Sequence, residues 1–210
     1  MLHLPRASGR FHPFPRQAAR LVFSFTPNSK KARYSMRQFK DMHIIGIDHG
    51  YGNLKTVNGI FPANVLPFDQ EPIHAQDLLV YGGKYYVIGS GHREFTPDKV
   101  SNSDHYILTL AGIGQELWAH RMTHARTYIA AGLPLTWVES QRESFRAYLL
   151  QNSHVDFTLR GIAYHVEIVG VSVYAQGFSA VVPMLRQFKG VNMLCDIGNG
   201  TMNIMTIQDR

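Results

Sequence analysis

The chain contains 210 residues, of which 45% are hydrophobic and 17% are charged, so its composition suits a packed core rather than general disorder. Its sequence has no run of the roughly 18–20 apolar residues that a membrane-spanning helix needs. A single cysteine, Cys195, excludes an internal disulfide and a zinc site of several thiolates, and it indicates a reducing, cytoplasmic compartment.

The formal net charge of +6 belongs to the N-terminal segment and not to the body of the chain. Residues 1–40 contain nine Lys or Arg and no Asp or Glu, whereas residues 41–210 contain twelve basic and fifteen acidic residues, a net charge of −3. A basic surface would suit nucleic acid, but this distribution removes that argument for residues 41–210.

Residues 1–42 are predicted to be a disordered basic extension, of which residues 1–35 pack against nothing. The prolines that interrupt any helix there are Pro5, Pro13, Pro15 and Pro27. Three interpretations stay open. Translation begins at Met36 or Met42 and the upstream residues are a mis-assigned extension, or the segment is a genuine tail, or it is a targeting or DNA-contacting arm.

The body opens with a strand, a glycine turn and a second strand, over residues 44–47 and 54–57. Residues 61–104 are rich in Pro, Gly and Asp, and we predict that they form a small inserted sublobe. Within it, residues 78–88 predict a hairpin that turns at Gly82-Gly83.

Helices and strands alternate through the next part, as is typical of an α/β fold. Apolar residues at helical spacing predict a mostly one-faced helix over residues 104–120. Residues 128–133 predict a buried strand that ends at Pro134. The capping-box pattern Ser140-x-x-Glu143 predicts that a second helix begins there.

The C-terminal third predicts two hairpins separated by a helix. The first hairpin turns near Arg160-Gly161. The helix is predicted over Gln176–Phe188, with Pro183 as an interior flaw. The second hairpin is predicted to pair residues 191–196 with residues 202–207.

Two turns of the form Asp-x-Gly-x-Gly each follow one predicted strand and precede another. They are Asp48-His49-Gly50-Tyr51-Gly52-Asn53 and Asp196-Ile197-Gly198-Asn199-Gly200-Thr201. Glycines let backbone N–H groups approach phosphate oxygens, and an aspartate at a strand end can hold Mg²⁺. One such turn is more often only a hairpin turn, but two of them favour a site that brackets one polyphosphate.

The candidate ligands follow from that chemistry. Asp48 and Asp196 are the predicted metal ligands, and Lys55 can reach a phosphate from the strand after the first turn. The predicted phosphate-binding residues are Gly50, Tyr51, Gly52, Asn53, Lys55, Gly198, Asn199, Gly200 and Thr201.

Other candidate sites are weaker. His120 and His124 have a metal-ligand spacing, but Arg121 and Thr123 between them indicate a solvated turn. Cys195 is predicted to be an inert thiol packed inside a buried strand.

Four segments carry a resemblance to a known family. They are Ile45–Lys55, Ala131–Leu135, Val173–Gly177 and Cys195–Thr201. In this order they resemble the plasmid-segregation actins of the ParM/StbA type, within the actin, heat-shock-chaperone and sugar-kinase superfamily. The resemblance covers nearly all of residues 43–210 and implies an RNase H-like, actin-like ATPase lobe that binds ATP and Mg²⁺.

The family also implies residue roles and partners. Gln176 stands at the place of the residue that orients the attacking water, so Gln176 and Asp196 are the predicted catalytic residues. The implied partners are further copies of the chain in a filament, and plasmid DNA held through an adaptor protein, with no membrane partner.

The resemblance further implies that residues 43–210 are only the N-terminal half of an actin-like protein, and that ATPase activity requires a second half. Two alternatives stay open. One is another ATPase or a small-molecule kinase of the same superfamily. Gln176 argues against a kinase, because it occupies the place where a kinase has a carboxylate base. The other is a non-enzymatic half-fold that caps or regulates a full-length relative.

Overall fold

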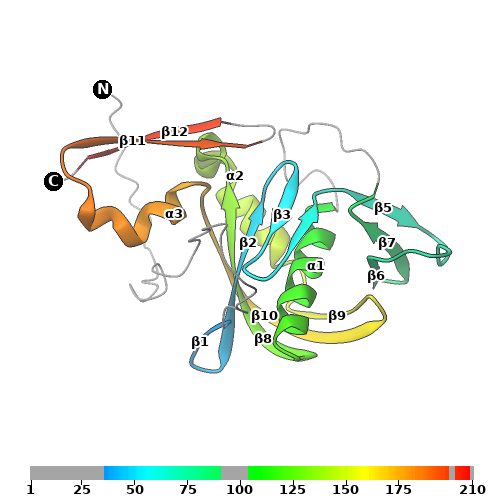
Figure 1. Cartoon of the computed structure of the whole chain (residues 1–210). Helices are drawn as coiled ribbons and strands as arrows, with labels where there is room; N and C mark the ends of the chain where they lie inside the picture. The colour runs from blue at the N-terminus through cyan, green and yellow to red at the C-terminus, as the bar shows by residue number, and fades with distance from the viewer. Residues whose placement is uncertain (1–35, 91–103, 199–201, 209–210) are drawn as a thin grey trace.

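The computed structural model describes residues 36–90, 104–198 and 202–208, and in these ranges ten strands form one mixed sheet (Figure 1). Nine strands follow the order β4-β3-β2-β8-β10-β9-β6-β7-β5, and β1 pairs antiparallel with β2. The strands are β1 (Arg37–Phe39), β2 (Met42–His49), β3 (Asn53–Lys55), β4 (Ile60–Pro62), β5 (Val65–Phe68), β6 (Leu78–Tyr81), β7 (Lys84–Ile88), β8 (His124–Leu133), β9 (His154–Leu159) and β10 (Ile162–Ala175). This sheet confirms the predicted α/β class, while the predictions for residues 1–35 lie outside the described residues.

The centre of the sheet is made of β2, β8 and β10, which run parallel to one another. Ile45 and Ile47 of β2 are buried, as the β-branched run predicts. Parallel strands bring their carboxyl ends to one edge of a sheet. The residues that follow these three strands therefore meet at that edge.

Helices α1 (Asp104–Ala119) and α2 (Leu135–Leu149) cover the same face of the sheet. Both contact the side chain of His49 in β2. Its Nε2 lies 2.7 Å from Thr109 Oγ1 of α1, and its ring packs edge-on against Phe145 of α2. In the described ranges, no helix is long and apolar enough to cross a membrane.

Helix α1 differs from the one-faced helix that its sequence predicts, because it is buried nearly all round. It contacts β2 and β3 on one side, β5, β7 and β9 on another, and α2. The sheet therefore curves around the helix. The buried carboxylate of Glu116 in this helix is satisfied, because it accepts hydrogen bonds from the backbone and side-chain amides of Asn58 at 2.7 and 2.8 Å.

Two predicted helix boundaries are wrong. Helix α2 begins at Leu135 and not at Ser140, because the fixed φ of Pro134 lets the chain turn at once, and the Trp137 N–H donates to the Pro134 carbonyl at 2.9 Å. Ser140 Oγ instead donates to the Trp137 carbonyl. In place of one helix over Gln176–Phe188 there are a short α3 (Phe178–Val181) and a 3₁₀ segment (Val182–Gln187). Pro183, which lacks an N–H, stands at the start of the latter.

The strands of the expected sublobe extend the main sheet. The predicted hairpin is confirmed as β6 and β7, with positive φ at Gly82 and Gly83, and β6 pairs antiparallel with β9. Strand β5 then forms the end of the sheet. Residues 91–103 of the same segment lie outside the described residues.

Strands β11 (Val191–Ile197) and β12 (Met202–Gln208) form a separate two-stranded sheet that lies beyond α3 (Figure 1). Most of the exposed side chains on this hairpin are apolar or weakly polar: Val191, Met193, Cys195, Ile197, Met202 and Ile204, beside the polar Thr206 and Gln208. The prediction that Cys195 is packed inside a buried strand is therefore wrong. Alternating apolar residues mark a strand face, but they do not show whether another element covers it.

We expect Cys195 to react with Ellman's reagent in the native chain at a rate within about tenfold of that in the urea-unfolded chain, because an exposed thiol is accessible without unfolding. The Cys195→Ser variant provides the baseline. Strong protection of the thiol until unfolding would show that this strand face is covered.

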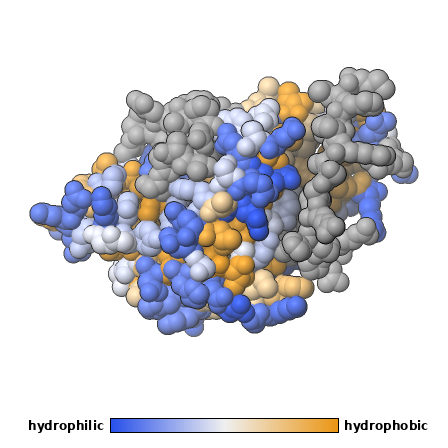
Figure 2. Space-filling model, turned by 180° about the vertical axis from the view of Figure 1, so that it is seen from behind, coloured by the Kyte–Doolittle hydropathy of each residue, from blue (hydrophilic) through white to orange (hydrophobic). Residues whose placement is uncertain are grey.

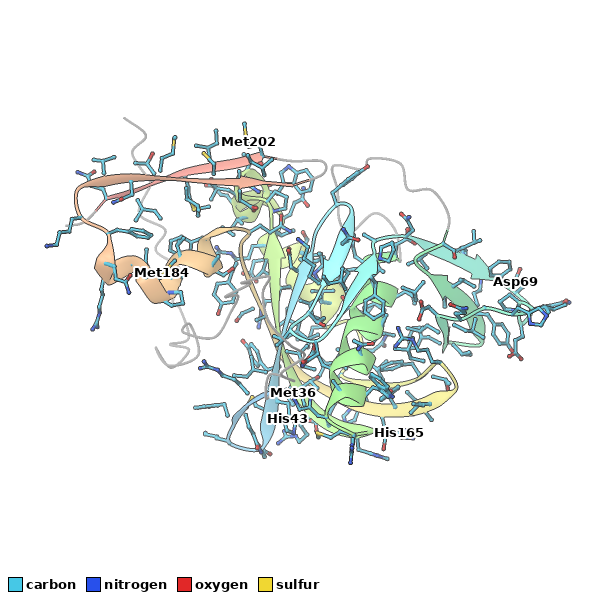
Figure 3. The ribbon with its side chains drawn as sticks, viewed as in Figure 1. Met36, His43, Asp69, His165, Met184 and Met202 are labelled. Atoms are coloured by element: carbon cyan, nitrogen blue, oxygen red, sulfur yellow. The ribbon has the colours of Figure 1, made fainter. Side chains whose placement is uncertain are left out.

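We expect His43 to make the folded chain sensitive to mild acid. Burial, with a smaller contribution from the neighbouring His120, lowers the pKa of His43 below its ordinary value of 6.5. Figure 3 shows His43 close to Met36, whose N–H donates to His120 Nε2 at 2.8 Å. The unfolded chain therefore binds the proton more readily than the folded chain.

The stability that neutral His43 contributes is fully present above the unfolded pKa and is lost as the pH falls through the folded pKa. We expect wild type to lose more free energy of unfolding between about pH 7.5 and pH 5 than His43→Gln, as measured by urea denaturation. Equal losses in the two proteins would contradict this assignment.

Candidate functional site

The β2–β3 hairpin positions the first Asp-Gly turn. Asp48 and Lys55 are directly opposite each other in the register, so their side chains share one face of the hairpin. Gly50 makes the turn tight: a Cβ on it would lie 2.6 Å from the Asn53 carbonyl oxygen. A side chain at residue 50 would therefore open the turn.

The end of β10 brings Gln176 to the first turn. Its backbone N–H donates to the Leu133 carbonyl at 2.8 Å, at the end of β8. Its side-chain amide Nε2 donates to Asp48 Oδ1 at 3.1 Å and to the His49 carbonyl at 3.3 Å. One glutamine thus links the carboxyl ends of the three parallel strands.

Gly132 provides the space for this glutamine. A Cβ on Gly132 would lie 2.9 Å from Gln176 Cγ, closer than carbon atoms can pack. The aliphatic part of the Gln176 side chain therefore lies directly against the backbone of β8.

We expect Gly132→Ala to lower the free energy of unfolding by about 1–3 kcal/mol, because the new methyl group overlaps Gln176. Adding Gln176→Ala should relieve the overlap and restore most of the loss. Urea denaturation of the single and double variants measures both. A loss that the second substitution leaves unchanged would place the strain elsewhere.

The second turn reaches the same place from β11. Asp196 lies against Gly177, at whose position a Cβ would be 2.8 Å from Asp196 Cβ. Described residues of both turns, together with Lys55 and Gln176, line a cavity of about 140 Å³. It is lined by Asp48, Gly50, Tyr51, Gly52, Asn53, Lys55, Gln176, Asp196, Ile197 and Gly198.

Every predicted site residue that the structure describes lines this cavity. Asn199, Gly200 and Thr201 complete the predicted set and lie outside the described residues. Two carboxylates and one ammonium group face a small polar space there, so an unaccompanied polyphosphate would meet net negative charge. The donor set of two carboxylates suits Mg²⁺, which in proteins takes one or two carboxylates and completes its coordination with phosphate and water.

Two residues that support the site, His49 and Asn203, are not among the predicted site residues. His49 is buried and donates from Nε2 to Thr109 Oγ1, whose own hydroxyl donates to the His105 carbonyl at 2.7 Å. This chain of bonds ties the first turn to α1. Asn203 of β12 is buried beside Asp196. The only sequence signal for Asn203 was a polar residue at an otherwise apolar strand position.

A second group of titratable side chains lies at the opposite end of the central strands. The rings of His124 and His165 stack with centroids 4.7 Å apart, and His165 Nδ1 lies 2.8 Å from Asp156 Oδ1. A hydrogen bond from Arg126 lowers the pKa of Glu167. Seen from behind, hydrophilic residues gather along the lower edge of the molecule (Figure 2). Within the described residues, no three His, Cys, Asp or Glu side chains are placed to hold a metal ion.

The fold and the paired turns agree with the actin-like lobe that the sequence resemblance implies. Residues 46–178 match the family described as "Actin like proteins N terminal domain". The chain belongs to this family of actin-like proteins, and the predicted family is confirmed. A comparison with curated proteins gave no match.

Solved structures show the same fold. The archaeal actin homolog Ta0583 matches with a TM-score of 0.62 and 20% identity, over 79% of this chain and 57% of its own. The apo pSK41 ParM protein matches with a TM-score of 0.54 and 13% identity, over 80% and 66%. Bacillus thuringiensis ParM with AMPPNP matches with a TM-score of 0.55 and 12% identity, over 80% and 57%. The chain thus spans 57–66% of the length of these structures.

Proposed function

We propose that the chain is the nucleotide-binding lobe of an actin-like protein that binds and hydrolyses ATP with Mg²⁺. The observation that carries this proposal is the single cavity into which Asp48, Lys55, Gln176 and Asp196 all project from separate elements. The ParM structure with AMPPNP supports a nucleotide as the ligand class.

The two turns are proposed to hold the phosphates. Residues 50–53, Lys55 and Gly198 line the cavity. The proposed donors are the backbone N–H groups of residues 50–53 and 198–201, where glycine leaves the approach open, and Lys55 adds a positive charge. Asp48 and Asp196 would hold Mg²⁺, which, when bound, neutralises the phosphate charge during phosphoryl transfer.

Gln176 is proposed to orient the attacking water. An amide cannot remove a proton near neutral pH, but it can fix the direction of a water molecule. Its Nε2 is held by Asp48 and the His49 carbonyl, which leaves Oε1 as the group to accept a hydrogen bond from water. As the water oxygen bonds to the γ-phosphorus, the bond to the β–γ bridging oxygen breaks, giving ADP and phosphate, and the water proton leaves to phosphate or solvent.

The same proposal includes assembly. We propose that copies of the full protein form cytoplasmic filaments that act in plasmid segregation, joined to DNA by an adaptor protein. The solved relatives include the Alp12 filament, with a TM-score of 0.51 and 18% identity. The net charge of −3 over residues 41–210 favours an adaptor over direct DNA contact.

Binding of a fluorescent ATP analogue, with Mg²⁺ and with EDTA, tests the metal-nucleotide site on the full chain. Asp196→Ala should lower the Mg²⁺-dependent affinity by at least about tenfold. Asp69→Ala is the matched control, since this carboxylate is 91% exposed and lies far from the cavity (Figure 3). Equal affinity in the Asp196 and Asp69 variants, or binding that EDTA leaves unchanged, would contradict the proposed site.

A non-catalytic function is the second candidate. Exposed apolar side chains along β11 and β12, among them Val191, Met193 and Ile197, favour contact with another protein chain. A half-fold that caps or regulates a full-length relative would change that relative's polymerisation at substoichiometric amounts without turning over ATP. Turnover by the chain itself would remove this alternative.

A further inference from the structure

Asn203 is the buried exception in an exposed hairpin. Its fractional exposure is 6%, whereas its neighbours Met202 and Ile204 are 61% and 49% exposed. A buried amide is costly unless its donor and its acceptor are both satisfied. The partners of Asn203 therefore explain why an amide stands at this position.

The two ends of the amide bind different elements. Asn203 Oδ1 accepts the Leu135 N–H at 3.0 Å, and Nδ2 donates to Asp196 Oδ2 at 3.4 Å. Asp196 is also its cross-strand partner in the hairpin. A backbone donor on one side and a carboxylate on the other define which end of the amide is oxygen and which is nitrogen.

Leu135 is the first residue of α2. Its N–H, like the other N–H groups in the first turn of a helix, has no acceptor within the helix. Pro134 precedes it and provides no side-chain cap. Asn203 therefore supplies the cap from an element that is 68 residues away in sequence.

We propose that Asn203 is a positioning residue that couples the Asp196 carboxylate to the N-terminus of α2. Because one amide makes both bonds, a change at Asp196, such as its engagement by a cation, alters how firmly the start of α2 is held. The coupling is reciprocal, so movement of α2 changes the orientation of Asp196. The involvement of a cation rests on the proposed function, whereas the bridge itself does not.

Amide hydrogen exchange at Leu135, measured by NMR on the ligand-free chain, tests the bridge. Asn203→Ala should speed this exchange about fivefold, as expected for loss of a helix cap. Asn192→Ala is the matched control, because Asn192 lies on β11 and its side-chain amide donates to the nearby Lys189 carbonyl. Unchanged exchange at Leu135 in Asn203→Ala would overturn the bridge.

The coupling has its own test in the same experiment. Asp196→Ala should also speed exchange at Leu135, by about two- to threefold, because the amide of Asn203 loses one of its two anchors. Asp48→Ala removes a carboxylate from the same cavity whose hydrogen bond is to Gln176, and it should leave exchange at Leu135 unchanged. If Asp196→Ala behaves like Asp48→Ala, the coupling is overturned.

A double-mutant cycle extends the test to the ligand. Asn203→Ala should reduce the Mg²⁺-dependent affinity for the ATP analogue about tenfold in wild type and should have little effect in the Asp196→Ala background. A full effect in both backgrounds would reduce Asn203 to a structural residue. If wild type shows no Mg²⁺-dependent binding, the proposed function fails, and the exchange results alone decide the bridge and the coupling.

Discussion

Gln176→Ala is expected to slow ATP turnover by about 100-fold while sparing nucleotide affinity, because a residue that orients water acts in the transition state. The structure holds this side chain between Asp48 and Gly132, at the junction of the three parallel strands. Turnover should be measured on a fusion protein. In it, this chain is joined to the part of a solved actin-like relative that has no counterpart in this chain.

Gln187→Ala is the matched control, since this glutamine is exposed on the 3₁₀ segment beyond α3. It should leave turnover unchanged. Equal turnover in wild type and Gln176→Ala would remove the catalytic assignment. A loss of affinity that matches the loss of turnover would instead make Gln176 a residue that organises the first turn.

Phe145→Ala is expected to cost about 3–5 kcal/mol of unfolding free energy. Phe145 is fully buried in α2, and its ring contacts His49, His105 and Tyr148 at centroid distances of 5.4, 6.1 and 6.2 Å. Its loss would leave a cavity where the two helices meet the strand that carries Asp48. Urea denaturation measures the cost.

Phe178→Ala makes the same truncation in α3, where the ring is 37% exposed. We expect a cost of about 1 kcal/mol or less there, because the ring leaves little cavity behind. Similar costs at the two positions would mean that the junction of α1, α2 and β2 is not the centre of the core.

The first turn could be predicted because its signals are local. A β-branched run that ends in Asp48 and is followed by Gly50 and Gly52 specifies strand, turn and strand without reference to the rest of the chain. The predicted turn at Gly82-Gly83 is confirmed for the same reason. The turns at Asp48 and Asp196 share one cavity although Asp196 comes from the separate β11–β12 sheet, an arrangement that the family resemblance implied.

Features that depend on distant elements could not be predicted. The capping-box pattern at Ser140 was misleading, since Pro134 starts α2 earlier and the cap comes from Asn203. The exposure of Cys195 depends on whether anything covers the hairpin, and α1 is buried nearly all round because the sheet curves around it. Neither fact is encoded in the periodicity of one segment.

The central claim is that the turns at Asp48 and Asp196 bind one polyphosphate with Mg²⁺. The most direct test is an NMR titration of the isotope-labelled full chain with Mg²⁺ and ATP, because shifts of backbone amides report even weak binding. We predict that the amide signals of Gly50–Asn53 and of Gly198 shift together along one binding curve, and that Asp196→Ala weakens both sets of shifts. Shifts in only one turn, or shifts centred on another part of the chain, would contradict the account.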